Sequence, residues 1–170
     1  MTKVLDLIKK SRSYRRFYQE TTISREELVL MVEAARFSPA SRNIQPLKYI
    51  LVNTPEECAE LFPTLAWAGY LTEWPGPEEG ERPSAYIIQL LDKNISNTPS
   101  CDHGITAQSI LLQATELGYG GCIIASIKRE ALSKIVNLPE NFEILQVIAL
   151  GKPKEVVVVD DLVDNEYKYW

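Results

Sequence analysis

Residues 41–52 read SRNIQPLKYILV and join a polar loop to an apolar run. The run from Leu47 to Val52 is aliphatic and aromatic, which predicts a strand. The loop before it carries more hydrogen-bonding groups than an ordinary turn needs. The amides of Asn43 and Gln45 both donate and accept, which suits the edge of a heteroaromatic ring. Either the loop satisfies its own backbone or it faces a bound molecule, and its residues alone leave both interpretations open.

Working outward, apolar periodicity and length predict an alternation of helices and strands. We expect helices over 3–10, 24–37, from 54 onward, 102–117 and 128–136, and strands over 47–52, 84–91, 122–125 and 142–150. Capping signals support the helices: Ser24 with Glu27 forms a capping box, Pro55 follows a Thr at a helix start, and Asp102 is the expected N-cap of the long apolar helix. The order favours an α+β or α/β fold with a sheet of four or more strands.

Length and composition indicate one domain over residues 1–170. Apolar residues make up 45% of the chain, and the formal net charge of −5 argues against nonspecific nucleic-acid binding. No apolar run approaches the roughly 18 residues that span a bilayer, and no leader pattern is visible, so we expect no membrane segment and a cytoplasmic location. With His103 as the one histidine and three scattered cysteines, we expect no metal site.

A second polar segment, Arg12-Ser13-Tyr14-Arg15-Arg16-Phe17, is strongly basic. In an extended chain Ser13 and Arg15 share one face and Arg16 takes the other. Guanidinium groups and a hydroxyl suit a phosphate, because charge-assisted hydrogen bonds compensate for its lost hydration. The alternative is a solvated basic loop.

The remaining candidates do not form a self-sufficient catalytic centre. Glycines 118, 120 and 121 follow a helix and precede a strand, the reverse of the order in a dinucleotide-binding fingerprint. Cys122 lies in an apolar strand and is expected to be a buried, unreactive thiol. His103, beside Asp102 at a predicted helix start, either is oriented for acid–base work or has a capping or packing role, and we expect the latter. Such a chain favours chemistry that resides in a cofactor.

Two segments are expected to be irregular. Residues 63–83 are rich in proline, glycine and aromatic side chains, which indicates an excursion that can cover a substrate. Within it, Trp67, Tyr70 and Trp74 either stack over a substrate or pack. The tail at 160–170 lacks helical periodicity and is either frayed or docked on another subunit.

In combination, the segments resemble the nitroreductase family of FMN-dependent flavoproteins. The matching pieces are R-S-x-R-x-F at residues 12–17, P-[AS]-[AS]-x-N-x-Q-P at 39–46, the helix DHGITAQSILLQATELGYG, the strand GCIIASI and ALGKPKE near the end. The segment WAGYL…W.GP.EGERPSAYI is similar to a short, single-domain branch of the family. The likeness extends over nearly the whole chain.

The resemblance implies an α+β fold with a central, mostly antiparallel sheet of four to five strands flanked by helices, in an intertwined homodimer with each flavin at the subunit interface. It also implies that FMN is held by three groups of residues. Arg12, Ser13 and Arg15 would hold the phosphate and ribityl chain, Pro39, Ala40, Ser41, Asn43 and Gln45 would contact the edge of the isoalloxazine ring, and Ile123, Ile124, Ala125 and Ser126 would lie against one face of that ring.

The implied reaction is a ping-pong hydride transfer from NAD(P)H through flavin N5 to a nitroaromatic, a quinone or a similar small acceptor, with no catalytic side chain. A non-catalytic flavin-binding or sensing protein is the alternative, and a different flavin reaction on the same fold is a third.

Two departures from the family pattern concern the phosphate. Ser11 stands where many relatives have a basic residue, and relatives commonly continue past the position of Trp170 with a Lys-Arg pair that reaches the phosphate. Either Lys152 or Lys154 takes that place, or the phosphate site is weaker, or the sequence is a shortened one.

Overall fold

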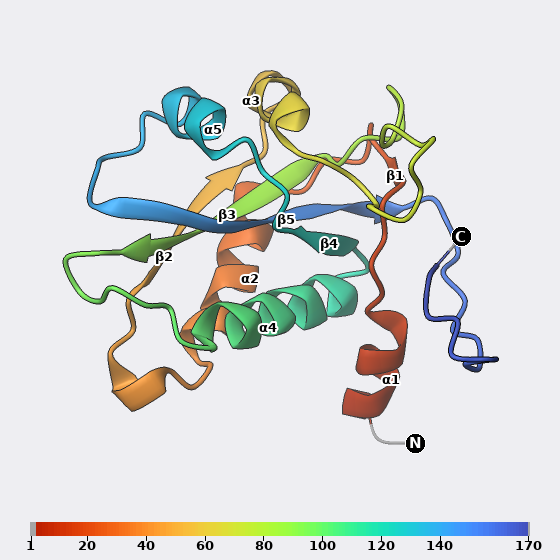
Figure 1. Ribbon diagram of the computed structural model, residues 1–170, viewed down its shortest axis with the longest axis horizontal. Coiled ribbons are helices and arrows are strands. Elements are labelled where there is room, and N and C mark those ends of the chain that lie inside the picture. The colour runs from red at the N-terminus through yellow and green to blue at the C-terminus, as the bar shows by residue number, and fades with distance from the viewer. Residues whose placement is uncertain (1–2, 170) are drawn as a thin grey trace.

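In residues 3–169, which the computed structural model describes, five strands pair into one sheet with helices on both faces (Figure 1). The strands are β1 (Phe17–Tyr18), β2 (Leu47–Val52), β3 (Ala85–Asp92), β4 (Gly120–Ile124) and β5 (Phe142–Pro153). The order is β1-β5-β3-β2, β4 also pairs with β5, and every one of these strand pairs is antiparallel. The helices are α1 (Lys3–Lys10), α2 (Arg25–Arg36), α3 (Pro55–Leu61), α4 (Asp102–Glu116) and α5 (Arg129–Ile135), and short 3₁₀ turns cover Ser41–Asn43 and Phe62–Thr64.

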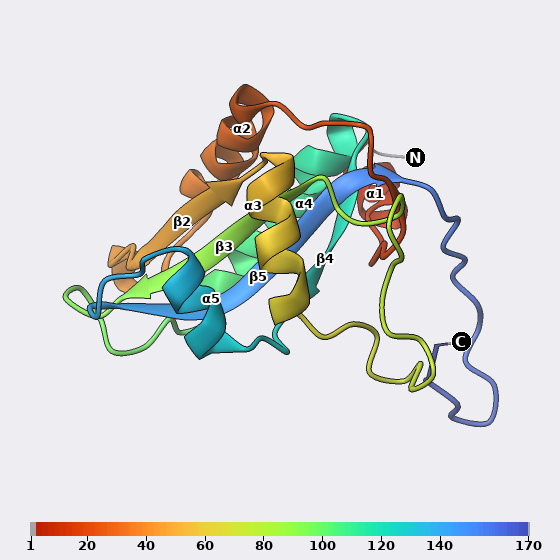
Figure 2. The same cartoon turned by 90° about the horizontal axis from the view of Figure 1, so that it is seen from above.

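The central strand β3 separates two hydrophobic cores. Every residue of β3 is buried, because helices cover both faces of the sheet (Figure 2). Tyr86 and Ile88 point into a core shared with α3 and α5, whereas Ala85 and Ile87 point into one shared with α2 and α4. This alternation explains why β3 is almost continuously apolar in sequence.

Local signals fix where the helices begin and end. Both hydrogen bonds of the capping box between Ser24 and Glu27 are present at the start of α2, and the Thr54 side chain caps α3, with Pro55 in its first turn. After α4, Gly118 takes a φ of 84°, a left-handed conformation that costs a glycine little. Asp102 is not the N-cap of α4: that residue is Cys101, and the Asp102 side chain accepts a hydrogen bond elsewhere.

The fold prediction is confirmed as α+β with a five-stranded antiparallel sheet, while the dimer stays a prediction. Between the 3₁₀ turn at Phe62–Thr64 and the start of β3, residues 65–84 form no helix and no strand of the sheet, so this segment is irregular as expected. It lies on the same side of the molecule as the tail (Figures 1 and 2), and Tyr70 contacts the rings of Tyr167 and Tyr169. Residue 170 of the predicted tail lies outside the described residues. None of the helices between residues 3 and 169 is long and apolar enough to span a bilayer.

Candidate functional site

A pocket of about 180 Å³ brings together two of the three predicted groups of site residues. Ser13 and Arg15 line it from the segment that leads into β1, and Ile123, Ile124, Ala125 and Ser126 line it from β4 and the turn that follows. Its other walls are residues 66–69, Cys122 and Tyr169. More than a hundred positions separate the two predicted groups along the chain, so the fold brings them together.

The two groups meet because the basic segment runs beside β4. Ser13 forms an isolated parallel bridge with Gly121, and the Tyr14 backbone N–H donates to the Gly121 carbonyl at 3.1 Å. Position 121 requires glycine, since a Cβ there would collide with the Ala149 carbonyl of β5. Position 120 requires glycine on the side of the basic segment, since a Cβ there would collide with the Tyr14 ring.

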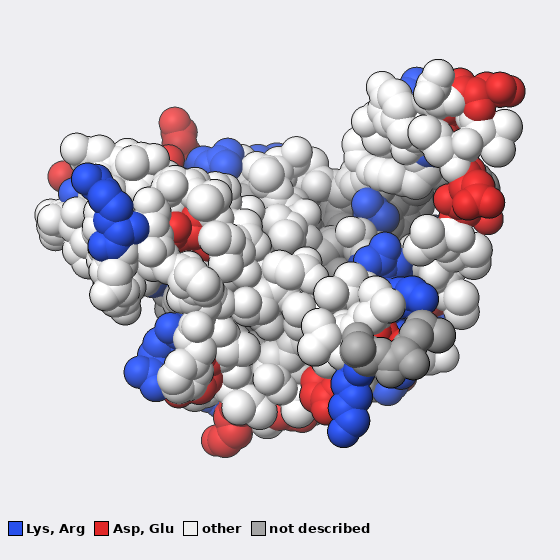
Figure 3. Space-filling view, turned by 90° about the horizontal axis from the view of Figure 1, so that it is seen from below, with Lys and Arg blue, Asp and Glu red and all other residues white. Residues whose placement is uncertain are grey.

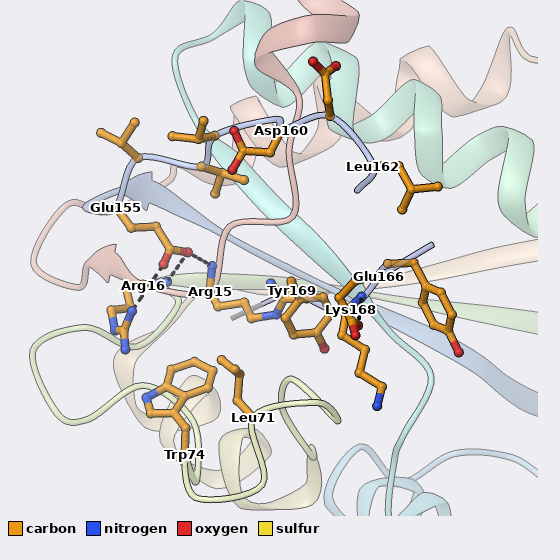
Figure 4. A pocket seen from close by; sticks show the side chains of 15 residues that line it. Arg15, Arg16, Leu71, Trp74, Glu155, Asp160, Leu162, Glu166, Lys168 and Tyr169 are labelled. Carbon is orange, nitrogen blue, oxygen red and sulfur yellow. Dashed lines mark hydrogen bonds and ion pairs between the residues drawn. The ribbon is translucent and has the colours of Figure 1, made fainter. Parts of the chain in front are cut away.

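Arg15 and Arg16 point to different surroundings, as the alternation of an extended chain predicts (Figure 4). A carboxylate oxygen of Glu155 accepts hydrogen bonds from both backbone N–H groups, which holds the segment in place. The Arg16 guanidinium then pairs with Glu81 at 3.4 Å and with Glu155 at 3.5 Å. The Arg15 guanidinium instead donates to the Ser13 carbonyl at 3.3 Å and lies under the Tyr169 ring.

Arg15 therefore reaches the pocket without an ion pair of its own, although Glu155, Asp160, Asp161 and Glu166 line an adjoining hollow with it (Figure 4). Within residues 3–169 it has no ion pair with a carboxylate. Figure 3 shows Lys and Arg side chains around a hollow beside the lobe that projects from this end of the molecule. A guanidinium without a carboxylate partner is a ready donor for an anionic group.

The other predicted basic residues lie outside this pocket. The Arg12 guanidinium donates to the carbonyls of Ile8 and Ser11, at the end of α1. Lys152 donates to the Gly118 carbonyl at 3.1 Å, and Lys154 pairs with Glu81 at 2.9 Å. In this chain Arg15 is thus the basic residue that lines the pocket itself.

The second predicted group, the loop over residues 39–45, is a strained turn. Arg42, Asn43 and Gln45 have φ values of 48°, 56° and 55°, which is the left-handed region that side chains other than glycine rarely adopt. Each such residue costs about 1 kcal/mol or more and persists only where its surroundings hold it. Such strain is a recurrent feature of ligand-binding loops.

Two sets of contacts hold the loop. The Ser41 backbone N–H donates to a carboxylate oxygen of Asp102 at 2.9 Å, and Asp102 is only 2% exposed. The Gln45 amide donates to the Asn43 side-chain oxygen at 2.8 Å. Pro39 and Ala40 lead into this turn and are exposed and partly buried, respectively. The amides are therefore fixed relative to each other at the surface.

Within one chain the loop at 39–45 lies at the other end of the sheet from the segment that leads into β1 (Figures 1 and 2), and none of its residues lines the pocket. Ser41 and Arg42 line a separate hollow of about 130 Å³ near the start of α4. The structure thus brings the first and third predicted segments, at 13–15 and 123–126, into one place and leaves the second, at 39–45, apart.

Cys122, the thiol at the pocket, is not poised to act as a nucleophile. Burial raises the pKa of the Cys122 thiol to about 12, so this cysteine stays neutral, in agreement with the sequence expectation. Trp67 lines the pocket from the hydrophobic core, and its indole N–H is buried without a partner in the described chain. Tyr70 is half exposed, and Trp74 stacks with Arg16. No cluster of three metal-ligating side chains occurs in the described part of the chain.

The sequence did not predict the roles of three residues at these sites. Glu155 holds the backbone of the basic segment, Asp102 holds the strained loop, and Tyr169 covers Arg15. Asp102 is 61 positions along the chain from its partner Ser41, and Glu155 is 140 positions from Arg15. No local sequence pattern predicts contacts over such separations. The aromatic run in the tail was a visible signal for Tyr169, but not for its partner.

Comparison with known proteins gives one family. The nitroreductase family model matches residues 8–83 and 86–152. One relative comes from Archaeoglobus fulgidus and carries the provisional name NADH dehydrogenase/NAD(P)H nitroreductase. It is 28% identical in sequence, over 91% of this chain and 88% of the relative's length.

Solved structures share the fold at lower identity. A nitroreductase family protein from Streptococcus pneumoniae superposes with a TM-score of 0.78 at 17% identity, covering 95% of this chain and 96% of that one. An FMN-dependent nitroreductase from Clostridium difficile gives 0.74 at 21% identity and covers 98% of both. The NADPH:FMN oxidoreductase of Vibrio harveyi, in complex with NAD⁺, gives 0.74 at 22%, covering 99% of this chain and 79% of that one. With the family model matched along most of its length, the chain belongs to the nitroreductase family.

Proposed function

We propose that this protein is an FMN-dependent NAD(P)H oxidoreductase that reduces nitroaromatics, quinones or similar small acceptors. The observation that carries the proposal is the shared pocket of Arg15 and residues 123–126, where a basic group stands next to an apolar strand surface. The names of relatives support it, since they include NAD(P)H nitroreductases, an FMN-dependent nitroreductase and an NADPH:FMN oxidoreductase.

The residues of the pocket fit an FMN molecule. Arg15 and Ser13 offer donors to a phosphate and a ribityl chain, and Ile123, which is 42% exposed, offers an apolar surface to a flat ring. Cations and apolar surface side by side are what a phosphorylated aromatic cofactor requires.

The bound FMN would supply the redox chemistry, taking a hydride from NAD(P)H and passing it to the acceptor in a ping-pong cycle. The residues of the chain hold the cofactor, orient its ring and leave one face open, and none of them needs to act as an acid, base or nucleophile.

We further propose that the site is shared between two copies of the chain. The loop at 39–45 contributes none of the residues that line the pocket, so within one chain it does not complete the site. A second copy can bring its loop, with Pro39, Ala40, Ser41, Asn43 and Gln45, to the ring edge.

Exposed apolar side chains supply a surface for that dimer. They lie on α1 (Val4, Leu5, Ile8), on α2 (Val29, Leu30) and at Phe37, which is 75% exposed. The tail adds Val156, Val158, Leu162 and Val163. Apolar side chains of this kind are available for burial between two copies of the chain.

The chain is proposed to act as one FMN-binding domain in which residues 63–83 serve as a lid. This excursion contributes residues 66–69 to the wall of the pocket and contacts the tail through Tyr70. Lids of this kind are long loops with few regular hydrogen bonds.

The proposal is tested with the purified protein. We expect it to bind FMN in equimolar amount and to bleach the flavin absorbance when NADH or NADPH is added without oxygen, with recovery on addition of a quinone or a nitroaromatic. Binding of FMN without bleaching by either nucleotide would instead identify a non-catalytic flavin-binding protein. A failure to bind FMN would contradict the whole proposal.

A further inference from the structure

A second polar site lies beneath α3, on the far side of β3 from α2 and α4. Arg82, Ser84 and Tyr86 alternate along the chain where it enters β3, so their side chains share one face. Each of them has a buried polar atom without a hydrogen-bond partner in the described chain: Nε of Arg82, Oγ of Ser84 and the hydroxyl of Tyr86. Buried polar groups are nearly always satisfied. Tyr86 lies in the hydrophobic core, whereas Arg82 and Ser84 also line a hollow, so these two indicate a missing partner there.

Arg82 and Ser84 open into a hollow of about 90 Å³. The polar side chains around it are Gln19, Thr22, Asn53, Cys58, Arg82 and Ser84. None of the residues that line it is an aspartate or a glutamate. A guanidinium is therefore the one charged group at this hollow among the described residues.

One contact positions the Arg82 guanidinium, and another holds the Arg82 backbone. Its Cζ atom lies 4.4 Å from the centre of the Phe62 ring, a cation–π contact that fixes the plane of the group. The Arg82 backbone N–H donates at 3.2 Å to the Gln19 side-chain oxygen, which also accepts from Gly80 at 2.8 Å. Within residues 3–169, Arg82 has no carboxylate partner, unlike Arg16 and Arg36.

The groups around the hollow are mainly donors. Because the Gln19 oxygen is already occupied by two backbone N–H groups, the free part of that amide is its NH₂. The hydroxyls of Thr22 and Ser84 can both donate, and the guanidinium donates from several nitrogens. Burial keeps Cys58 neutral, because it raises the pKa of that thiol to about 12.

We propose that this hollow binds a small oxyanion, of the class of phosphate, sulfate or a one- or two-carbon carboxylate, through Arg82, Ser84 and Gln19. A positive pocket without a carboxylate suits an anion with several acceptor oxygens. The volume of about 90 Å³ excludes a nucleotide or a flavin. The hollow shares no lining residue with the pocket at Arg15, so the site is independent of the proposed flavin site.

Isothermal titration calorimetry with inorganic phosphate tests the site at fixed ionic strength. The FMN-saturated protein is used, together with Arg15→Gln, so that phosphate binding near Arg15 is separated from binding beneath α3. We expect one phosphate per chain in both. Arg82→Gln should weaken this binding about 10- to 100-fold, because it removes a charge-assisted contact. Ser84→Ala is a smaller change and should weaken it roughly two- to tenfold.

The matched control is Arg36→Gln, which removes the same charge from an exposed ion pair on α2 and should bind phosphate as the unaltered protein does. Circular dichroism establishes whether each variant is folded. If Arg82→Gln does not fold, the phosphate affinity of Ser84→Ala tests the proposal instead. Sulfate and formate in place of phosphate report whether the site prefers a tetrahedral or a planar anion. The proposal is overturned if neither Arg82→Gln nor Ser84→Ala changes phosphate binding, or if none of the three anions binds at tens of millimolar, which would mean that ordered water alone fills the hollow.

Discussion

Arg15 and Arg16 are adjacent in sequence, but their environments give them different roles. Arg16 is neutralised by Glu81 and Glu155, whereas Arg15 faces the pocket without a carboxylate partner in the described chain. We expect Arg15→Gln to weaken FMN binding about 10- to 100-fold, since a charge-assisted contact to the phosphate is lost. A titration followed by flavin fluorescence measures the change.

Arg16→Gln is the matched control for this prediction. It loses surface ion pairs that are worth at most about 1 kcal/mol, so its FMN affinity should stay within about twofold of the original. Equal losses in the two variants would contradict the assignment, because they would show that FMN responds to the overall charge of the segment rather than to Arg15.

Asp102 positions the strained loop. Two substitutions of Asp102 distinguish the effect of its hydrogen bond from the effect of its charge. Asp102→Ala leaves the Ser41 N–H without its acceptor, which should cost about 1–3 kcal/mol in the free energy of unfolding. FMN affinity should fall as well, because Asn43 and Gln45 are no longer held in their left-handed conformations. Urea denaturation and the FMN titration measure the two effects.

Asp102→Asn keeps an acceptor oxygen in the same place, so it should retain most of the stability and most of the FMN affinity. If Asp102→Asn is as damaging as Asp102→Ala, the negative charge at the start of α4 matters more than the acceptor. Sequence reasoning singled out Asp102 but predicted a local capping role. The actual partner, Ser41, is 61 positions away, and only the packing of the loop against α4 reveals it.

At the scale of elements, α2 shows how a helix signal in sequence becomes a pH-dependent contribution to stability. The carboxylate of Glu27 accepts a hydrogen bond from the Ser24 backbone N–H at 2.9 Å and another from the Tyr119 hydroxyl at 3.0 Å. The hydrogen bond from the Ser24 backbone is the largest effect, and it lowers the pKa of Glu27 below its ordinary value of 4.5. The ionised form therefore favours the folded protein.

The sign of the expected pH effect follows from this direction. The contribution of Glu27 is fully present above pH 4.5 and is lost as the pH falls through the lower pKa of the folded state. At neutral pH, Glu27→Gln should therefore be less stable than the unaltered protein, by an amount within the roughly 0.5–2 kcal/mol typical of capping interactions. The difference should shrink towards about pH 3.

Urea denaturation at the two pH values measures this difference. Glu26→Gln is the control, because Glu26 is exposed in the same first turn but does not take part in the capping box. A difference for Glu27→Gln that stays constant between the two pH values would contradict the role of the ionised carboxylate.

The elements were the most predictable part of the fold, since their signals lie within a few residues. The strand at Leu47–Val52 and the helix α1 have the predicted bounds, and α2 and α3 begin at their predicted caps. The far end of β5 was not predicted: it continues to Pro153 because β1 pairs with Lys152 and Pro153. That pairing depends on residues more than a hundred positions away and has no local pattern.

At the scale of the molecule, the distance between the loop at 39–45 and the pocket at Arg15 is the strongest argument for a dimer. The sequence motifs predicted the residues of the pocket and of the loop. They do not say whether the pocket and loop of one site belong to the same copy of the chain or to two copies. A strained, well-anchored loop at the surface, remote from the pocket that it is expected to complete, is explained if its partner pocket lies on another copy.

Subunit complementation tests this arrangement directly. Arg15→Gln damages the pocket, and Asn43→Gly removes a loop amide while tolerating the positive φ of 56°. In a shared site, a heterodimer of the two variants has one site with both lesions and one with neither. We therefore expect each homodimer to bind FMN weakly and the heterodimer, purified through two different affinity tags, to bind one FMN per dimer with the original affinity. If both ends of the site come from one chain, the heterodimer has no intact site and no such binding appears. If the Asn43→Gly homodimer binds FMN with the original affinity, Asn43 does not contact the ring edge. If the protein is a monomer in size-exclusion chromatography, the proposal of a shared site is wrong.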